Sequence, residues 1–331
     1  MPRILVFILA FAALSCLPVV VASNLTVHYI DIGEGDTTLI TYQNWTLLID
    51  SGGPLDSQRE KIVAYLSGLN ITGISLAIAT HADPDHIGQF THLMNAMPFD
   101  QFWVNGLSHT SELWQAMNQT IHNLGIPLHV GRIHTRYDMG DVDLVVLSPF
   151  EPFFGDEDKD SIVARLGYQL VSFMFMGDAD SDTEHRQTFI SSIWPRADVL
   201  KLGQHGSMNS SSAEWLAAVD PSVAIISGGR PDSETLERLA ARGIPVFRTD
   251  VHEEFIDDII ATTDGHSLTI RQASTGKAWR IPEPTGLMPV VALSASLQLL
   301  GKHRRSLHSL NGNRAPHETA SCTANNICRK V

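Results

Sequence analysis

Cysteine is scarce in this sequence. Among its 331 residues there are three cysteines, Cys16, Cys322 and Cys328. The stretch between Cys16 and Cys322 contains no thiol, which excludes a cysteine nucleophile or a thiolate zinc ligand unless the C-terminal tail folds back onto it. Cys322 and Cys328 are close enough in sequence to close a small disulfide loop outside a reducing compartment. A metal centre in the main part of the chain is therefore expected to use nitrogen and oxygen ligands.

Basic residues and long apolar runs are also in short supply. The chain has 23 Lys and Arg against 36 Asp and Glu, a net charge of −13, although the balance reverses after residue 301. Because an acidic body repels phosphate backbones, nucleic acid is expected only as a substrate, bound through the basic tail or through metal ions. The two longest apolar segments, residues 4–14 and 287–300, are shorter than the ~20 residues that cross a bilayer. No transmembrane channel is predicted.

The N-terminus has the pattern of a secretory signal peptide. Arg3 precedes the apolar residues 4–14, and Val20 and Ala22 fit the small-residue positions of a signal-peptidase site. Cleavage after Ala22 is expected, which makes residues 1–22 a signal peptide and the mature protein secreted or extracytoplasmic. The alternatives are a membrane span and a lipoprotein anchored through Cys16.

Five of the twelve asparagines lie in N-x-[ST] sequons, namely Asn24, Asn44, Asn70, Asn118 and Asn209. Such sequons also arise by chance, and they carry glycans only in a eukaryotic secretory pathway. They are consistent with export and do not establish it.

The order of the expected elements predicts an α/β fold of packed layers. Three β-rich runs at residues 25–32, 37–42 and 45–50 predict an antiparallel meander, and Asp56 is expected to cap the helix that follows. An apolar strand is expected at residues 74–79. Further strands are predicted at residues 102–105, 142–148, 162–166, 169–176, 199–202, 223–227 and 246–247, helices at 111–124, 213–219 and 234–241, and a closing hairpin at 259–262 and 267–270. Strands that alternate with helices favour helices packed on sheets.

Residues 23–273 are expected to form one domain. Residues 274–331 differ in composition: a Pro/Gly linker, a short apolar segment at 287–300 and a basic tail. The apolar segment is expected to be a helix docked on the body, with a membrane-surface anchor as the alternative.

Polar residues that can bind a metal follow three of the expected strands. Residues 80–86, Thr-His-Ala-Asp-Pro-Asp-His, place two imidazoles and two carboxylates directly after the strand at 74–79. Asp178 and His205 follow two other strands. Because ligands gather at the strand ends of an α/β sheet, the three loops are expected to face one cleft. Taken alone, residues 80–86 could also be a surface turn whose Asp and His residues serve only solubility. That alternative does not explain why Asp178 and His205 also follow strands directly.

These motifs resemble the metallo-β-lactamase superfamily, and within it the branch that includes the soluble hydrolase domain of the competence DNA-uptake protein ComEC. The matching segments are Asp31-Ile32-Gly33-Glu34-Gly35-Asp36, Leu48-Ile49-Asp50-Ser51-Gly52-Gly53, the block from His81 to His86, Met176-Gly177-Asp178-Ala179, residues 200–207 (Leu-Lys-Leu-Gly-Gln-His-Gly-Ser), and Arg248-Thr249-Asp250. They span residues 25–271 in the order that the family has.

The resemblance implies an αββα four-layer sandwich with two divalent metal ions at one edge of the sheets. It implies that His81 and Asp83 bind the first ion, that Asp85, His86 and His205 bind the second, and that Asp178 bridges both together with a hydroxide that attacks the substrate. Asp85 and Asp178 are the expected catalytic residues. Asp50 matches a family aspartate that orders the site without binding metal.

Two departures from the broader family pattern bear on the metals. Asp83 stands where the superfamily commonly has histidine. Zinc is the expected metal, but manganese becomes an alternative because an oxygen ligand replaces an imidazole. Gln204 stands where the ComEC-like branch has a second histidine before the Gly-Ser pair. No clear counterpart exists for the separate histidine that completes the first site in true β-lactamases, and Asp160 is a candidate for its place. Lys201 is expected either to steer an anionic substrate or to end a strand.

The sequence therefore predicts a secreted metal-dependent hydrolase of phosphodiester or nucleic-acid substrates. A lactam, lactone or ester hydrolase is the second hypothesis. The third is a catalytically weak binding protein that retains the fold. The partner expected from the first two is a small-molecule or phosphodiester substrate, and the sequence carries no signal for the oligomeric state.

Overall fold

The computed structural model describes residues 23–190, 195–249, 257–273, 276 and 278–281. The expected signal peptide, Asp250 of the last motif, and the linker, apolar segment and tail after residue 281 lie outside the described residues. Within the described residues, no helix is both long enough and apolar enough to cross a membrane.

The first sheet has nine strands and begins with the predicted meander. Its strand order is β16-β15-β14-β1-β2-β3-β4-β5-β6, and β1, β2 and β3 are antiparallel neighbours. The strands are β1 (Leu25–Tyr29), β2 (Thr38–Tyr42), β3 (Trp45–Ile49), β4 (Leu76–Ile78), β5 (Phe102–Val104), β6 (Leu128–Val130), β14 (Ile259–Thr263), β15 (Leu268–Gln272) and β16 (Ala278–Ile281). The pairing of β16 with β15 continues the sheet past residue 273, where the domain was expected to end.

The second sheet has seven strands in the order β13-β12-β11-β10-β9-β8-β7. These strands are β7 (Arg136–Asp138), β8 (Val142–Ser148), β9 (Val163–Tyr168), β10 (Val171–Phe175), β11 (Val199–Lys201), β12 (Val223–Ile226) and β13 (Val246–Arg248). The strands from β10 to β13 are parallel and are joined through helices, as βαβ connections require.

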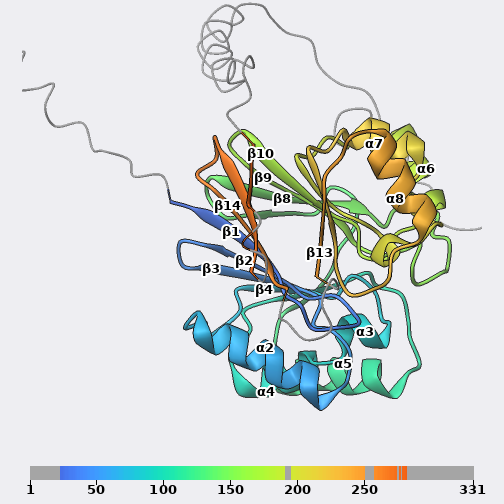
Figure 1. Ribbon diagram of the computed structural model, residues 1–331. Coiled ribbons are helices and arrows are strands. Elements are labelled where there is room, and N and C mark those ends of the chain that lie inside the picture. The colour runs from blue at the N-terminus through green and yellow to red at the C-terminus, as the bar shows by residue number, and fades with distance from the viewer. Residues whose placement is uncertain (1–22, 191–194, 250–256, 274–275, 277, 282–331) are drawn as a thin grey trace, which may run out of the picture. The chain divides into compact units, whose positions relative to one another are not determined.

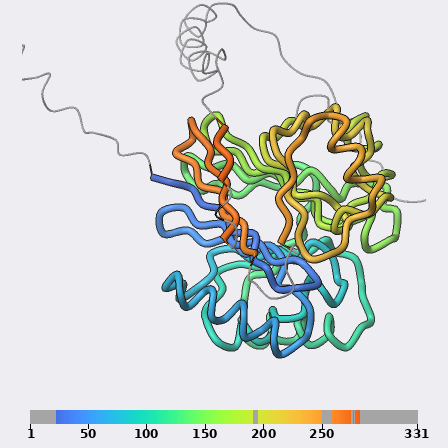
Figure 2. The backbone as a smooth tube through the Cα atoms, viewed as in Figure 1, coloured from blue at the N-terminus to red at the C-terminus, as the bar shows by residue number. Residues whose placement is uncertain are grey.

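Helices cover the outer face of each sheet, which makes the predicted αββα sandwich (Figure 1). They are α2 (Asp56–Gly68), α3 (Pro84–Ile87), α4 (Phe90–Ala96), α5 (Glu112–Leu124), α6 (Ser181–Ile190), α7 (Ala213–Val219) and α8 (Ser233–Ala241). The tube view shows α2 to α5 on one side of the paired sheets and α6 to α8 on the other (Figure 2). The fold class expected from the sequence is confirmed.

Three apolar clusters hold these layers together. The central cluster lies between the sheets, where Tyr29 of β1 packs against Phe175 of β10. A second cluster lies under α2 and α5, and a third is built around Trp215 of α7. Burial of apolar surface on both faces of both sheets is the main favourable term for a fold of this kind.

The N-terminal ends of the helices show where a local capping residue fixes the start of a helix and where it does not. Ser111 caps α5 by accepting a hydrogen bond from the Trp114 backbone N–H, and Ser212 caps α7 in the same way, as N-cap serines do. The prediction for Asp56 is wrong: α2 begins at Asp56, the N-cap is Leu55, and Asp56 pairs with Arg59 one turn on.

Candidate metal centre

The six ligands predicted from the sequence come together at one edge of the sandwich. The loop after β4 carries His81 and Asp83 and leads into α3, which carries Asp85 and His86. Asp178 follows β10, and His205 lies in the short 3-10 helix η1 (Gln204–Gly206) after β11. Each loop leaves the carboxyl end of its strand. The first sheet thus supplies four of these side chains and the second supplies two.

One half of the site is formed by Asp85, His86, His205 and Asp178. The Nε2 atom of His86 lies 3.3 Å from Asp178 Oδ1, and Nε2 of His205 lies 3.6 Å from Asp178 Oδ2. Asp85 Oδ2 is 3.3 Å from His205 Nε2 and 3.9 Å from His86 Nε2. These atoms surround a single small volume, as the ligands of one cation would.

The other half contains a residue that the sequence analysis missed. His81 Nε2 lies 4.0 Å from Asp83 Oδ2 and 3.9 Å from Asp158 Oδ1, and Asp158 groups with His81 and Asp178 as a possible metal site. Asp160, the predicted candidate, does not face this volume: its carboxylate accepts hydrogen bonds from the backbone of Phe154 and Gly155. The acidic run at residues 156–160 was the available signal, but it could not tell which carboxylate points inward.

The polar atoms at the centre of the cluster fit a bound cation. The Nε2 atoms of His81, His86 and His205 and Oδ1 of Asp178 are buried, and none has a hydrogen-bond partner within the part of the chain that the structure describes. Buried polar atoms without partners are costly, and three nitrogens and an oxygen left unpaired at one point are most simply accounted for by metal ions.

The pKa values of the side chains at the site also fit a bound cation. The pKa of Asp158 is raised to about 6 by burial and by the nearby Asp178 carboxylate, and burial and Asp85 raise the pKa of Asp83. Burial alone would lower the pKa of His205, but Asp36 raises it to about 10. Without a cation His205 therefore holds a proton at neutral pH, and a metal that binds through its Nε2 must displace that proton.

Asp50 orders this site from behind. Its carboxylate accepts hydrogen bonds from the Thr80 backbone N–H, from Thr80 Oγ1 and from Nδ1 of His86, each at 2.8 Å. The bond to Nδ1 fixes the imidazole so that Nε2 faces the metal volume, which is how carboxylates orient metal-binding histidines. The ordering role that the family resemblance implied for Asp50 agrees with this geometry.

A buried ion pair lies directly behind His205. Lys201 forms an ion pair with Asp36, both side chains are almost fully buried, and Ser227 Oγ donates to the same Asp36 carboxylate at 2.6 Å. Asp36 is 3.6 Å from Nδ1 of His205, the ring atom turned away from the metal volume, so we place Asp36 behind the site although it clusters with the ligands. Lys201 is the last residue of β11, as one of the two sequence-based expectations had it. Because its side chain is enclosed and paired with Asp36, it does not reach substrate, so the other expectation is wrong.

Gln204 bonds to a neighbouring carboxylate. Its Nε2 donates to Asp158 Oδ2 at 3.2 Å, so the residue that replaces the expected second histidine holds the carboxylate that faces His81. Gln204 therefore helps to position Asp158 beside His81.

Glycines allow the loops of the two sheets to touch. Gly228, which follows β12 with a φ of +73°, lies so close to the carbonyl of Gly35 that an added Cβ would overlap it. The Gly35 N–H donates to the Gly228 carbonyl, and Asp36 N donates to the Asp85 carbonyl. This close backbone approach connects the loop that carries Asp85 to the second sheet.

A family model agrees with this fold and this site. The model described as the metallo-β-lactamase superfamily matches residues 30–230, a range that contains all the residues of the cluster. The chain belongs to the metallo-β-lactamase superfamily.

Within this superfamily the chain is similar to bacterial competence proteins. It is 28% identical over 248 residues to ComE operon protein 3 of Bacillus subtilis, covering 68% of this chain and 32% of the relative. It is 26% identical over 229 residues to competence protein ComA of Neisseria gonorrhoeae, covering 67% of this chain and 30% of the relative. The chain thus spans about a third of the length of these relatives, and the predicted likeness to the ComEC-type hydrolase domain is confirmed.

A solved structure shares the fold. The metallo-β-lactamase fold protein YhfI of Bacillus subtilis superposes with a TM-score of 0.50 at 12% identity, covering 78% of this chain and all of that protein. Members of this superfamily are mostly metal-dependent hydrolases, and the Asp/His cluster of this chain is a possible metal site.

Proposed function

We propose that this chain is an exported hydrolase that cleaves phosphodiesters with two divalent metal ions. The observation that carries the proposal is the group of four buried atoms without hydrogen-bond partners, contributed by His81, His86, His205 and Asp178 from both sheets. In this proposal Asp178 is shared by the two ions. His81, Asp83 and Asp158 complete one site, and the other is completed by Asp85, His86 and His205.

The metal ions would supply a water of lowered pKa and would stabilise negative charge on the phosphoryl oxygens. The protein itself would hold the metal ligands in place and leave one side of the metal site open to solvent. The side chains of Asp83, Asp85 and Asp158 are 44%, 42% and 38% exposed, whereas the three histidines are largely buried. The substrate therefore approaches from the carboxylate side. Asp85 and Asp178 are the catalytic residues in this proposal: Asp85 borders the open side, and Asp178 lies between the two halves.

The ligand set bears on metal identity. It contains four carboxylates and three imidazoles, one carboxylate more than the sequence had indicated. Imidazole suits zinc, while carboxylates suit manganese, so Asp158 strengthens the case for manganese beside zinc.

The substrate class is supported by the relatives and not by the pocket shape. The names of two relatives refer to competence and recombination: competence protein ComA of Neisseria gonorrhoeae and recombination protein 2 of Haemophilus influenzae, to which the chain is 28% identical over 221 residues. The motifs also resemble the hydrolase domain of a DNA-uptake protein, which favours a nucleic-acid substrate. Four acidic ligands repel a phosphodiester in the absence of metal, so binding of such a substrate is expected only after the ions neutralise the site. Export is supported by the signal-like pattern of residues 1–22.

A single experiment separates the three hypotheses. Purified protein is analysed for bound metal and then assayed with bis-p-nitrophenyl phosphate, single-stranded DNA and nitrocefin, with zinc or manganese added. We expect about two metal ions per chain and turnover of the two phosphodiesters. Turnover of nitrocefin alone would replace this proposal by a lactamase, and metal-free, inactive protein would replace it by a binding protein.

A further inference from the structure

We propose that the five sequon asparagines are N-glycosylation sites, so that the mature protein carries sugars over several of its surfaces. The sites are Asn24, Asn44, Asn70, Asn118 and Asn209. In this reaction the side-chain Nδ2 forms a bond to the anomeric carbon of a lipid-pyrophosphate-linked oligosaccharide. The bond from that carbon to the pyrophosphate breaks, the lipid pyrophosphate leaves with the bonding electron pair, and the amide loses one proton.

Sequons are far more frequent in the folded body than chance provides. Eight asparagines lie between residues 23 and 281, and five of them are followed at the second position by Ser or Thr. Serine and threonine together make up 50 of the 331 residues, so chance alone would give about one such match among eight asparagines. Four of the five have threonine at that position.

All five asparagines are exposed in the folded chain. Asn24 immediately precedes β1, Asn44 lies in the turn between β2 and β3, and Asn70 follows the end of α2. Asn118 is on the outer side of α5, and Asn209 lies between η1 and α7. Asn105, the one fully buried asparagine among the described residues, is not in a sequon. A glycan is bulky and polar, so this is the distribution that folding with attached sugars requires.

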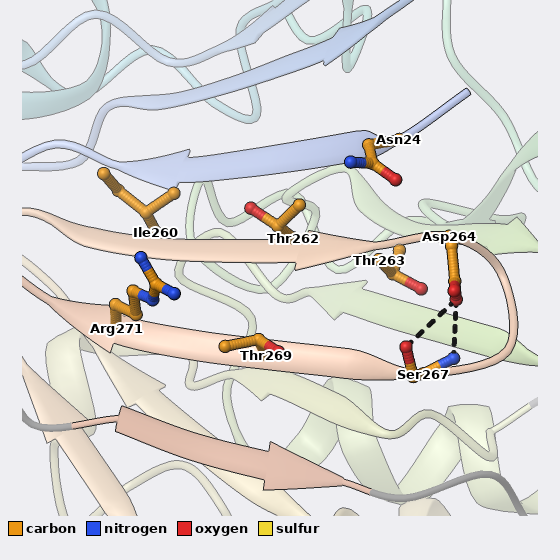
Figure 3. Close-up of a pocket in the computed structure, with 8 residues that line it drawn as sticks. All are labelled: Asn24, Ile260, Thr262, Thr263, Asp264, Ser267, Thr269 and Arg271. Atoms are coloured by element: carbon orange, nitrogen blue, oxygen red, sulfur yellow. Dashed lines mark hydrogen bonds between the residues drawn. The ribbon is translucent and has the colours of Figure 1, made fainter. Parts of the chain in front are cut away.

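Four of the five asparagines also border surface hollows. Asn24 lines a hollow of about 430 Å³ whose wall, from β14 and β15, includes Thr262, Thr269 and Arg271 (Figure 3). Hydroxyl groups and a guanidinium are hydrogen-bonding partners for sugar hydroxyls. Asn118 lines a hollow of about 470 Å³ on α5, and Asn44 and Asn70 together line one of about 490 Å³. Each hollow offers room beside the attachment atom for the first sugar of a glycan.

The positions of the sites are compatible with the metal centre. Asn24, Asn44, Asn70 and Asn118 lie on elements and turns that carry none of the residues around the metal volume. Asn209 lies four residues after His205, but its backbone carbonyl accepts a hydrogen bond from Ser181 at the start of α6. Sugars on Asn24, Asn44, Asn70 and Asn118 can therefore cover surfaces built from elements that carry none of the residues of the metal centre.

The inference goes beyond the proposed hydrolase activity and does not depend on it. It requires only that the chain passes through a compartment with an oligosaccharyltransferase. An inactive protein that carries glycans would contradict the proposed hydrolase activity alone. An active protein without glycans would contradict the glycosylation proposal alone.

Mapping of the protein secreted by its own source tests the inference directly. The full chain is treated with peptide N-glycosidase in heavy-oxygen water, which converts each occupied asparagine to labelled aspartate, and its peptides are sequenced by mass spectrometry. We expect label at all five sites and a fall in intact mass on deglycosylation. Any of the five that is recovered only as unlabelled asparagine is not a glycosylation site, and label at two or fewer would overturn the inference as a whole.

Matched variants test the attachment rule at one site. In the full chain secreted from a eukaryotic cell line, Asn70→Gln and Thr72→Ala should each remove one glycan, while Thr72→Ser should retain it. Thr72 is exposed, and Asn95→Gln, on the exposed side of α4 and outside any sequon, should change nothing. If Thr72→Ala and Thr72→Ser migrate alike before and after deglycosylation, Asn70 is not a glycosylation site.

Discussion

At the scale of single residues, Asp178 is the side chain that both halves of the metal centre share. Its two oxygens lie 3.3 Å from His86 and 3.6 Å from His205. Asp178→Ala removes this shared negative ligand and leaves two cations to repel each other, so we expect bound metal and hydrolysis to be lost together. Ser207→Ala, in the same group of loops, should retain both. Metal analysis and a phosphodiesterase assay check this, and an active, fully metallated Asp178→Ala protein would refute the assignment.

Asp158 is predicted to serve only one of the two sites. It faces His81 and is held by Gln204. It groups with His81 and Asp178, whereas His86 and His205 belong to the other group around Asp178. Asp158→Ala should therefore lower metal content from about two ions to about one per chain. The Asp160 carboxylate accepts hydrogen bonds from the backbone of Phe154 and Gly155, so Asp160→Ala should keep both ions but lower the thermal stability of the protein. If the two variants bind the same amount of metal, Asp158 is not a ligand.

The buried Lys201–Asp36 pair is a second residue-scale test. Removing one partner leaves a charge buried without compensation, which costs about 3–5 kcal/mol, so Lys201→Met should lower the free energy of unfolding by that order. The double variant Lys201→Met/Asp36→Asn should be less destabilised than the sum of its two single variants. Urea unfolding of the chelator-treated proteins measures the coupling. Additive effects would mean that the pair does not interact in this way.

At the scale of elements, a carboxylate pair joins the loop after β1 to the start of β14. Asp258 Oδ1 accepts a hydrogen bond from the Asp31 backbone N–H at 2.8 Å, and Asp31 Oδ2 accepts one from Asp257 N at 3.0 Å. Burial, with the Asp31 charge adding to it, raises the pKa of Asp258 to about 6. The native state therefore binds more protons than the unfolded state between about pH 4 and pH 6, and this group makes the protein less stable as pH rises through that window.

Asp258→Asn removes that titration and keeps the acceptor oxygen. We expect the variant to be more stable than the natural protein at pH 7–8 and the difference to vanish below about pH 4, as measured by urea unfolding across pH. Asp264→Asn, in the β14–β15 turn, is the comparison, because backbone hydrogen bonds from Ser267 and His266 lower the pKa of Asp264 and give the opposite sign. A gain in stability that is the same at every pH would show that ionisation of Asp258 is not its cause.

Two of the elements that the sequence analysis missed, β6 and α6, lack an apolar pattern. The residues of β6 are all exposed, and α6 buries Thr183, Glu184 and Gln187 in place of an apolar stripe. Glu184 accepts hydrogen bonds from the backbone of Ser211 and Ser212, and Gln187 donates to the Leu147 carbonyl. Apolar periodicity cannot reveal a helix that packs through polar contacts to distant loops.

At the scale of the molecule, metal ions would join the two sheets. The loop after β4 belongs to the first sheet, and the loops that carry Asp178 and His205 belong to the second. A ligand that binds only the folded state stabilises it by about 2.7 kcal/mol at a concentration of about 100 Kd. Chelation should therefore lower Tm by roughly 5–10 °C, and readdition of zinc or manganese should restore it. A Tm that chelator leaves unchanged in protein shown to have lost its metal would contradict this link.

The sequence by itself determined the fold class and most of the strands, and it predicted six of the residues that the structure brings together at the candidate metal centre. Those conclusions rest on short-range patterns: the block from His81 to His86 occupies a single turn, and Asp178 and His205 each follow an apolar strand directly. Tertiary structure alone decided that Asp158 and not Asp160 faces His81, that Lys201 is buried against Asp36, and that β16 extends the first sheet. The first two contacts join residues far apart in the chain, and their geometry depends on how the two sheets pack, which no local pattern of residues specifies. The residues of β16 are exposed except Ile281, so they lack the apolar alternation that would mark a strand.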